Sequence, residues 1–363
     1  MISRLAVFLV SLLVTLPVTA TPQAEIQKLP SRLAKSTGLP QSEIAGWFDR
    51  VSYQKKIIDA ITRPSEGLPW YRYKKIFLNK RRIDGGVAFW KKHRKDLESA
   101  EKQYGVPAEI IVAIIGVETQ YGHNKGRWSA LDSLATLAVG YPRRSKFFYT
   151  ELVQLVRLAK EEKLSPVQLK SSYAGALGLP QFMPSSYRAY AVDFNADGQR
   201  DLLNSEADAI GSVANYFARH GWKKNAPVVA RAKIKSKAGL KLVNKKLKPS
   251  MTLAQLAQKG IKPLVNMPQT EKATVLGYDE KTRKNYQLGF KNFYVITRYN
   301  TSRNYAMAAW LLAQEVAYPL FAHAEAVKGG GVVVADAGVP GGLEHSLASL
   351  FGELVKQIAD GGA

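Results

Sequence analysis

Cysteine is absent from this sequence, acidic residues are few, and only one stretch is both long and apolar. Without cysteine the chain cannot form disulfides, thiolate nucleophiles, zinc sites built on cysteine or a lipid attachment through sulfur. Its 29 Asp and Glu face 52 Lys and Arg, which gives a formal net charge of +23. Charged residues nevertheless make up only 22% of the 363 positions and apolar residues 46%, so we expect two or three packed domains instead of a disordered polycation.

The single long apolar stretch lies at the N-terminus. Arg4 precedes an apolar run of about twelve residues, and Val18-Thr19-Ala20 offers small side chains to a peptidase. The pattern predicts an exported chain whose signal peptide, residues 1–20, is cleaved after Ala20. The alternative is an uncleaved membrane anchor, although a span needs ~20 apolar residues.

The excess of positive charge predicts an anionic partner. An exported protein is poorly placed to meet nucleic acid, so we expect no nucleic acid partner. The basic surface instead favours peripheral association with an anionic polymer of the cell wall or with the head groups of a membrane. The alternative is that Lys and Arg only keep the surface soluble.

Composition divides the remaining chain into segments. Residues 21–104 are predicted as helices with basic faces, 105–222 as apolar helices bounded by glycine, 223–295 as a small β-containing domain, 296–321 as a return to helix, and 322–363 as a glycine-rich tail with one amphipathic stretch. Individual helices are expected at 42–60, 87–104 and 305–318, and β-prone runs at 274–276, 287–288 and 293–296 around a turn at 279–281. The fold class is therefore mainly α, with a minor β component (α+β).

Glu118 interrupts an apolar helix that is expected to start near Pro107. The segment between them is apolar nearly all round, as in a buried helix, and Glu118 follows Ile114 and Ile115 by four and three positions. Burial on this isoleucine face would raise the pKa of the carboxyl group and keep it protonated near neutrality, which is the state that a general acid needs. The alternative is a structural Glu bonded to Arg127 or to backbone amides.

The segment 172–187, SYAGALGLPQFMPSSY, combines small residues with polar and aromatic ones. Glycine and alanine allow a backbone to approach a ligand closely, while Ser172, Gln181 and Tyr187 offer the hydrogen bonds and stacking that sugars require. The alternative is a tight junction between a helix and a loop.

Residues 193–199, DFNADGQ, match the opening of an EF-hand calcium loop, with glycine at position six. The oxygen donors at positions one, three, five and seven are Asp193, Asn195, Asp197 and the backbone carbonyl of Gln199. Position twelve is Asn204 instead of Glu, so a later acid such as Glu206 or Asp208 would have to complete the six to eight oxygens of the calcium shell. The alternative is an Asx-rich turn without a metal.

Four separated blocks carry a resemblance: 118–122, 172–187, 193–217 and 297–300. In this order and at these spacings the sequence resembles the lytic murein transglycosylase B family of Gram-negative bacteria (glycoside hydrolase family 103), from about residue 30 to about residue 318. The resemblance implies a lysozyme-like helical core flanked by a helical domain and a small antiparallel β-domain. The missing lipid-attachment cysteine and the glycine-rich tail depart from the membrane-bound members, so we expect a soluble or periplasmic variant. We also expect a monomer.

The resemblance also implies an activity and residues that carry it. The family cleaves the β-1,4 bond between N-acetylmuramic acid and N-acetylglucosamine of peptidoglycan strands without water, and the product closes as a 1,6-anhydro sugar. Glu118 would protonate the glycosidic oxygen and then accept the proton of the sugar's own C6 hydroxyl. The positions that match the glycan groove of the family are Ser172, Gln181, Tyr216, Tyr299, Asn300, Tyr305 and, less distinctively, Tyr73. For a structural calcium ion the resemblance favours Asp208 as the last ligand, and it implies no organic cofactor.

The acidic residues give an independent argument about mechanism. Ordinary glycosidases use two carboxylates, ~5–5.5 Å or ~6.5–9.5 Å apart, whereas between 107 and 190 only Glu118 interrupts an apolar face. Asp132 is expected to be an N-cap, and Glu161 and Glu162 to lie on a solvated face. A lone carboxylate suits a mechanism in which the substrate's 2-acetamido group stabilises the anomeric centre, although a partner folded in from elsewhere stays open. Two further alternatives are a hydrolysing muramidase of the same fold and a non-catalytic basic module that binds the cell wall.

Overall fold

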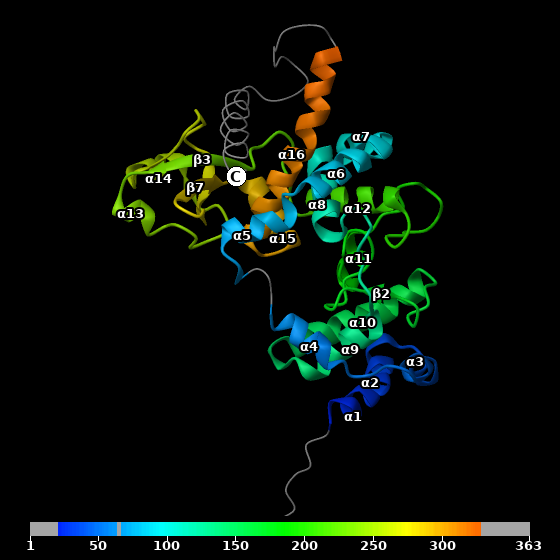
Figure 1. Ribbon diagram of the computed structural model, residues 1–363. Coiled ribbons are helices and arrows are strands. Elements are labelled where there is room, and N and C mark those ends of the chain that lie inside the picture. Colours follow the sequence, from blue (N-terminus) through cyan, green and yellow to red (C-terminus); the bar gives the residue numbers. More distant parts are fainter. Residues whose placement is uncertain (1–20, 64–66, 328–363) are drawn as a thin grey trace, which may run out of the picture.

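The computed structural model describes residues 21–63 and 67–327, so the predicted signal peptide and the amphipathic stretch of the tail lie outside the described residues. This part of the chain is mainly helical with a small antiparallel sheet, as predicted (Figure 1). Its helices are α1 (Pro22–Gln27), α2 (Leu29–Thr37), α3 (Gln41–Phe48), α4 (Lys55–Ile61), α5 (Trp70–Phe77), α6 (Lys80–Lys92), α7 (Arg94–Tyr104), α8 (Ala108–Thr119), α9 (Ala130–Gly140), the 3-10 turn η2 (Pro142–Arg144), α10 (Ser145–Glu161), α11 (Pro184–Tyr190), α12 (Glu206–Arg219), α13 (Lys237–Leu240), α14 (Leu253–Gln258), α15 (Lys291–Tyr299) and α16 (Arg303–Val327). None of these described helices is long and apolar enough to span a bilayer.

One group of helices is formed by α1, α2 and α4 packed on α9 and α10, in the lower part of Figure 1. The continuous helix expected at 42–60 is wrong, because the chain breaks between α3 and α4. In this break the N–H of Ser52 donates to Oδ1 of Asp132 at 3.0 Å, and the N–H of Gln54 donates to the hydroxyl of Thr136 at 3.0 Å. Polar side chains of α9 therefore compete with the helical hydrogen bonds of the linker and anchor it to α9.

A second group surrounds α8, which contacts α6, α7, α12 and α16. Ten residues of this 12-residue helix are buried, so the prediction of an almost wholly enclosed helix is confirmed. The continuous helix expected at 87–104 is wrong, since it divides at His93 into α6 and α7. The residues 21–104 thus contribute to both groups of helices, with α1–α4 in the first and α5–α7 in the second.

The strands form two antiparallel sheets. They are β1 (Trp128–Ser129), β2 (Lys170–Ser171), β3 (Val229–Ile234), β4 (Met251–Thr252), β5 (Ile261–Pro263), β6 (Lys272–Asp279) and β7 (Lys284–Gly289). β1 pairs with β2, and the larger sheet has the order β4-β6-β7-β3-β5. β6 and β7 form a hairpin whose connection begins after Asp279, so the two predicted strands and the turn between them are confirmed.

The strand expected at 293–296 is wrong, because these residues lie in α15. Phe293, Ile296 and Thr297 follow the helical spacing of three and four residues, and all three are buried. Burial of one helical face therefore outweighs the β-propensity of aromatic and branched side chains. The next helix, α16, begins at Arg303 and continues beyond the predicted end at residue 318, which carries it past the predicted start of the tail at residue 322.

Candidate active site

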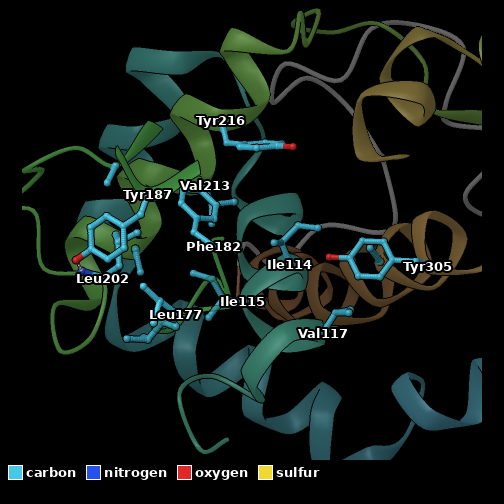
Figure 2. Packing of buried hydrophobic residues seen from close by; sticks show 14 of the residues in the cluster. Ile114, Ile115, Val117, Leu177, Phe182, Tyr187, Leu202, Val213, Tyr216 and Tyr305 are labelled. Atoms are coloured by element: carbon cyan, nitrogen blue, oxygen red, sulfur yellow. Dashed lines mark hydrogen bonds between the residues drawn. The ribbon is translucent and has the colours of Figure 1, made fainter. Parts of the chain in front are cut away.

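Glu118 lies in the last turn of α8 and meets a tyrosine from the far end of the sequence. The hydroxyl group of Tyr305, on α16, donates to Oε1 of Glu118 at 2.5 Å. Tyr305 is only 3% exposed, and in Figure 2 its hydroxyl group points toward α8. The carboxylate singled out in the sequence is therefore held by a residue 187 positions away.

A second tyrosine, Tyr299, lies beside this pair. Its ring is parallel to that of Tyr305, with centroids 6.5 Å apart and planes 8° apart, and its hydroxyl group donates to the carbonyl of Pro180 at 2.5 Å. Burial raises the pKa of both phenols well above its usual value, and the nearby charge of Glu118 raises it further. Both phenols therefore stay protonated and act as hydrogen-bond donors at neutral pH.

Two other predicted site tyrosines are buried in supporting positions. Tyr216, on α12, is 7% exposed, donates to the carbonyl of Arg298 at 2.6 Å and packs edge-on against Tyr299 at 4.9 Å between centroids. Tyr73, on α5, is 1% exposed and close enough to Tyr305 to raise the pKa of that phenol. Neither ring has the exposed face that a sugar would stack on.

The loop 172–181 packs against the end of α8 through Thr119, which is 1% exposed. The Thr119 hydroxyl lies 2.9 Å from the carbonyl of Leu179 and accepts the N–H of Gly122 at 3.0 Å. Thr119 is not among the site residues predicted from the sequence, where its only signal is its position beside Glu118. This contact fixes the loop relative to the carboxylate.

Within that loop, the predicted residues Ser172 and Gln181 brace the backbone. The Ser172 hydroxyl accepts the N–H groups of Ala174 at 3.3 Å and of Ala176 at 3.1 Å. The side-chain amide of Gln181 donates to the carbonyl of Gly178 at 2.8 Å. A hydroxyl that accepts two N–H groups still has its own proton to donate, so Ser172 can bind a sugar while it holds the turn.

Tyr187, also considered as a sugar contact, has another place in the structure. It is fully buried, donates to the carbonyl of Arg200 at 2.5 Å and accepts the N–H of Leu202 at 2.9 Å. Figure 2 shows it on the opposite side of the core from Tyr305. The expectation that it binds sugar is therefore wrong, and it packs in the core.

The chain turns sharply directly after Glu118. Gln120, Tyr121 and Gly122 have φ angles of 50°, 60° and 89°, a left-handed conformation that costs roughly 1–2 kcal/mol for each residue with a side chain. Tyr121 fills the space left by glycines, because a Cβ added to Gly116 or Gly86 would lie 2.4 or 2.5 Å from its hydroxyl oxygen. This wedge between α6 and α8 fixes where the helix ends and hence where Glu118 lies.

The other acids between 107 and 190 have partners of their own. Asp132 accepts the N–H of Ser52, Glu151 accepts the N–H and hydroxyl of Ser185 at 2.9 and 2.6 Å, Glu161 pairs with Arg188, and Glu162 pairs with Arg200. Asp132 is not the N-cap of α9, which is Ser129, and the glutamates expected among solvated lysines bind arginines instead.

Glu109 is the remaining acid of this segment, and burial raises the pKa of its carboxyl group to about 7. It lies nine positions before Glu118 on α8, or about 14 Å along the helix axis. Glu118 is thus the acid of this segment that meets the tyrosines.

The loop 193–199 folds like the opening of an EF-hand. The carboxylate of Asp193 accepts the N–H groups of Asp197 at 3.1 Å and of Gly198 at 2.8 Å. The side-chain amide of Asn195 donates to Asp197 at 2.8 Å, so the three predicted side-chain oxygen donors gather at one end of the loop. Their oxygen chemistry is that which calcium prefers.

Asp208 lies beside this loop at the start of α12 and is completely buried. Its Oδ1 accepts the N–H of Phe194 at 2.8 Å, and its Oδ2 accepts the N–H of Asp201 at 2.8 Å. Asp208 therefore closes the loop by binding backbone amides at both ends. Among the side chains that the structure describes, up to residue 320, no three His, Asp or Glu residues are grouped closely enough to hold a metal by themselves.

The chain is similar to known proteins in sequence and in structure. The profile of the transglycosylase SLT domain matches residues 21–314, and the membrane-bound lytic murein transglycosylase B of Escherichia coli is 45% identical over 248 residues, 68% of this chain and 67% of the relative. The chain belongs to the lytic transglycosylase family. Among solved structures, soluble lytic transglycosylase SltB1 from Pseudomonas aeruginosa matches with a TM-score of 0.77 and 44% identity over 82% of this chain and 99% of that one. Lytic transglycosylase Slt35 of Escherichia coli in complex with calcium matches with a TM-score of 0.75 and 38% identity over 82% and 94%.

Membership of the lytic transglycosylase family confirms the resemblance inferred from the four sequence blocks. The structural neighbours also confirm the predicted fold class, a lysozyme-like helical core with a small antiparallel sheet. In this lytic transglycosylase, Glu118 lies at the junction of α8, the loop 172–181 and α16.

Proposed function

We propose that this lytic transglycosylase cleaves the β-1,4 bond between N-acetylmuramic acid and N-acetylglucosamine of peptidoglycan strands and leaves 1,6-anhydro ends. Glu118 is its general acid and then its general base. The observation that carries the proposal is the 2.5 Å contact between the Tyr305 hydroxyl and the Glu118 carboxyl group. It supports a role in proton transfer because the contact orients the carboxyl group, which is only partly buried.

The proposed mechanism moves one proton in each step and consumes no water. Protonated Glu118 gives its proton to the glycosidic oxygen as the bond to the anomeric carbon breaks, and the substrate's 2-acetamido group stabilises that carbon. The Glu118 carboxylate then takes the proton of the C6 hydroxyl, whose oxygen closes on the anomeric carbon. Between the two steps the Tyr305 hydroxyl donates a hydrogen bond to the Glu118 carboxylate and so stabilises the charged form of Glu118.

The predicted groove residues divide into two proposed roles. Ser172, Gln181 and Asn300 are partly exposed and can reach a sugar. Tyr73 and Tyr216 are buried, so we assign them a positioning role through Tyr305 and Tyr299. Sequence position alone could not separate these roles, because it does not give burial.

Digestion of purified sacculi tests the function. We expect soluble muropeptides with anhydro ends. Binding to sacculi without any soluble product would instead support the non-catalytic basic module, and hydrated reducing ends would support the muramidase.

We also propose a calcium ion in the loop 193–199. Asp193, Asn195, Asp197 and the carbonyl of Gln199 would hold it, and Asp208 would complete the shell. Oδ1 of Asp208 accepts the N–H groups of Phe194 and Asn195, whereas Oδ2 accepts only that of Asp201 and retains a second lone pair for the ion. The calcium complex of the related Slt35 supports the proposal. The positive charge of the ion would offset the negative charges of its carboxylate ligands, and its bonds to Asp208 would connect the loop to α12.

A thermal-shift assay with calcium checks this site. The ion should raise the unfolding temperature, because a ligand at about 100 times its Kd stabilises a fold by about 2.7 kcal/mol. Asp193→Ala should remove the response. Asp201→Ala is the matched control and should retain it, because the Asp201 side chain accepts the N–H groups of Leu203 and Asn204 and is not a proposed ligand. An unchanged unfolding temperature of the unmutated protein would favour the metal-free Asx turn.

The activity implies a location outside the cytoplasm, where peptidoglycan lies. We propose that the chain is periplasmic, is exported by cleavage of residues 1–20 and acts as a monomer. We also propose that 105–222 form the catalytic core, flanked by 21–104 and 223–295, and that 296–321 return to the core with Tyr299 and Tyr305.

A further inference from the structure

One long segment of the chain has no acidic residue. Between Asp208 and Glu271 the sequence contains no Asp or Glu, while lysine recurs along it. The segment includes β3 and β5, which are the last two strands in the order of the larger sheet, so β5 forms one edge of that sheet. Part of the excess positive charge therefore has a definite place in the fold.

The pairing of these two strands places like charges side by side. Lys233 lies directly opposite Lys262 in the antiparallel register. The ladder continues on both sides of this pair, because the N–H of Lys235 donates to the carbonyl of Gly260 at 2.8 Å and the N–H of Leu264 donates to β3 at 2.9 Å. Side chains alternate between the two faces of a sheet, so four residues share one face, which we call the basic face: Lys233, Lys235, Lys262 and Leu264.

The basic face is open to solvent, whereas the other face of the same strands is packed. On the packed side, Ala232 and Ile261 belong to a core that includes Leu253 of α14. All four residues of the basic face are exposed, Leu264 by 55% of its surface, and none of its lysines forms an ion pair with a described residue. Like charges directly opposite one another destabilise a sheet, so folding alone does not account for this arrangement.

We propose that the basic face is an interaction surface that binds the anionic head groups of a phospholipid membrane. Lysines are attracted to a negatively charged lipid surface, and an exposed leucine among them can enter the boundary between head groups and acyl chains. A soluble acidic polymer would pair with the lysines but leave Leu264 in water, so the leucine favours a lipid surface. Because the chain has no cysteine to carry a lipid, this contact is reversible and non-covalent.

The basic face is separate from the proposed active site. In Figure 1 β3, α13 and α14 lie to the left of α8, which carries Glu118. A protein bound to a membrane through β3 and β5 therefore keeps Glu118 accessible to a glycan strand.

Sedimentation with lipid vesicles tests the proposal. The protein is the processed chain, residues 21–363, and the vesicles contain phosphatidylcholine alone or with one third phosphatidylglycerol. We expect binding only to the vesicles with phosphatidylglycerol. In the combined variant Lys233→Gln, Lys235→Gln, Lys262→Gln the partition coefficient should fall about 100-fold, because each lysine near an anionic surface contributes about fivefold. The variant should stay folded, since it removes the repulsion between two opposed lysines.

Two further variants separate the apolar contact from the charge and the basic face from the net charge. Leu264→Gln keeps every charge and should lower the partition coefficient about tenfold, because no leucine leaves water on binding. The combined variant Lys91→Gln, Lys95→Gln, Lys102→Gln removes three exposed lysines from α6 and α7. At physiological salt it should bind like the unmutated protein, since charges beyond about 8 Å of the lipid are screened.

Four results would overturn the proposal. They are no binding to the anionic vesicles, equal binding to the neutral ones, an equal loss in the variant of α6 and α7, and full binding by Leu264→Gln, which would indicate a soluble polyanion as the partner. All variants should release anhydro-muropeptides at the rate of the unmutated protein. Vesicle binding is measured without substrate, so its failure is distinct from a failure of the proposed function.

Discussion

Replacing Glu118 with glutamine is expected to reduce the release of anhydro-muropeptides at least about 10⁴-fold. General acid–base catalysis contributes about 10²–10⁴-fold for each proton transfer, and here one group performs both transfers. Glutamine keeps the shape of the side chain, and its carbonyl oxygen can still accept the hydrogen bond of Tyr305 at the position of Oε1. It can neither give a proton to the glycosidic oxygen nor take one from the C6 hydroxyl. Product release from sacculi, measured by chromatography, checks the change.

Glu109→Gln is the matched control, because it makes the same substitution at the other end of α8. Burial raises the pKa of Glu109 to about 7, so this carboxyl is also perturbed, but it lies far from Tyr305. The variant should keep full activity, and both variants should unfold at temperatures close to that of the unmutated protein. Undiminished release of anhydro-muropeptides by Glu118→Gln would show that Glu118 is not the catalytic acid.

Gly178→Ala is expected to lower the free energy of unfolding by about 3 kcal/mol. Gly178 has a φ of 69°, which costs a residue with a side chain about 1–2 kcal/mol, and an added Cβ would lie 2.2 Å from the carbonyl oxygen of Leu202. That contact is with backbone, so the loop itself must shift, at a further cost of about 1–3 kcal/mol. Because Thr119 binds the same loop at Leu179, activity should fall as well.

Gly38→Ala separates the cost of backbone strain from the cost of the contact with Leu202. Gly38 has a similar φ of 77° but nothing within 4 Å of an added Cβ, so only the backbone strain of about 1 kcal/mol should appear. Urea denaturation of both variants measures the difference. Equal losses in the two would show that the Leu202 contact has no effect.

Local patterns made part of the site predictable. The nearly all-apolar sequence of α8 made Glu118 visible, and the alternation of oxygen donors with a glycine made the loop 193–199 visible. Both signals depend on residues a few positions apart. The contact of Glu118 with Tyr305 depends on the path of the chain over 187 positions, and without the family resemblance no spacing rule would pair them.

The errors have a common physical cause, which is tertiary contacts that override local preference. The residues 293–296 have high β-propensity, yet their burial pattern fits a helix. The helix expected at 42–60 is interrupted where backbone amides bind Asp132 and Thr136 of α9. Tyr187 has the chemistry of a sugar platform and is buried in the core.

In the proposed mechanism the substrate's own C6 hydroxyl, and not water, closes the reaction under the control of Glu118. The most direct measurement is digestion of sacculi in water enriched in oxygen-18, followed by mass spectrometry of the new glycan ends. We expect ends that are one water lighter than a reducing sugar and carry no heavy oxygen. Reducing ends that have incorporated oxygen-18 would contradict it.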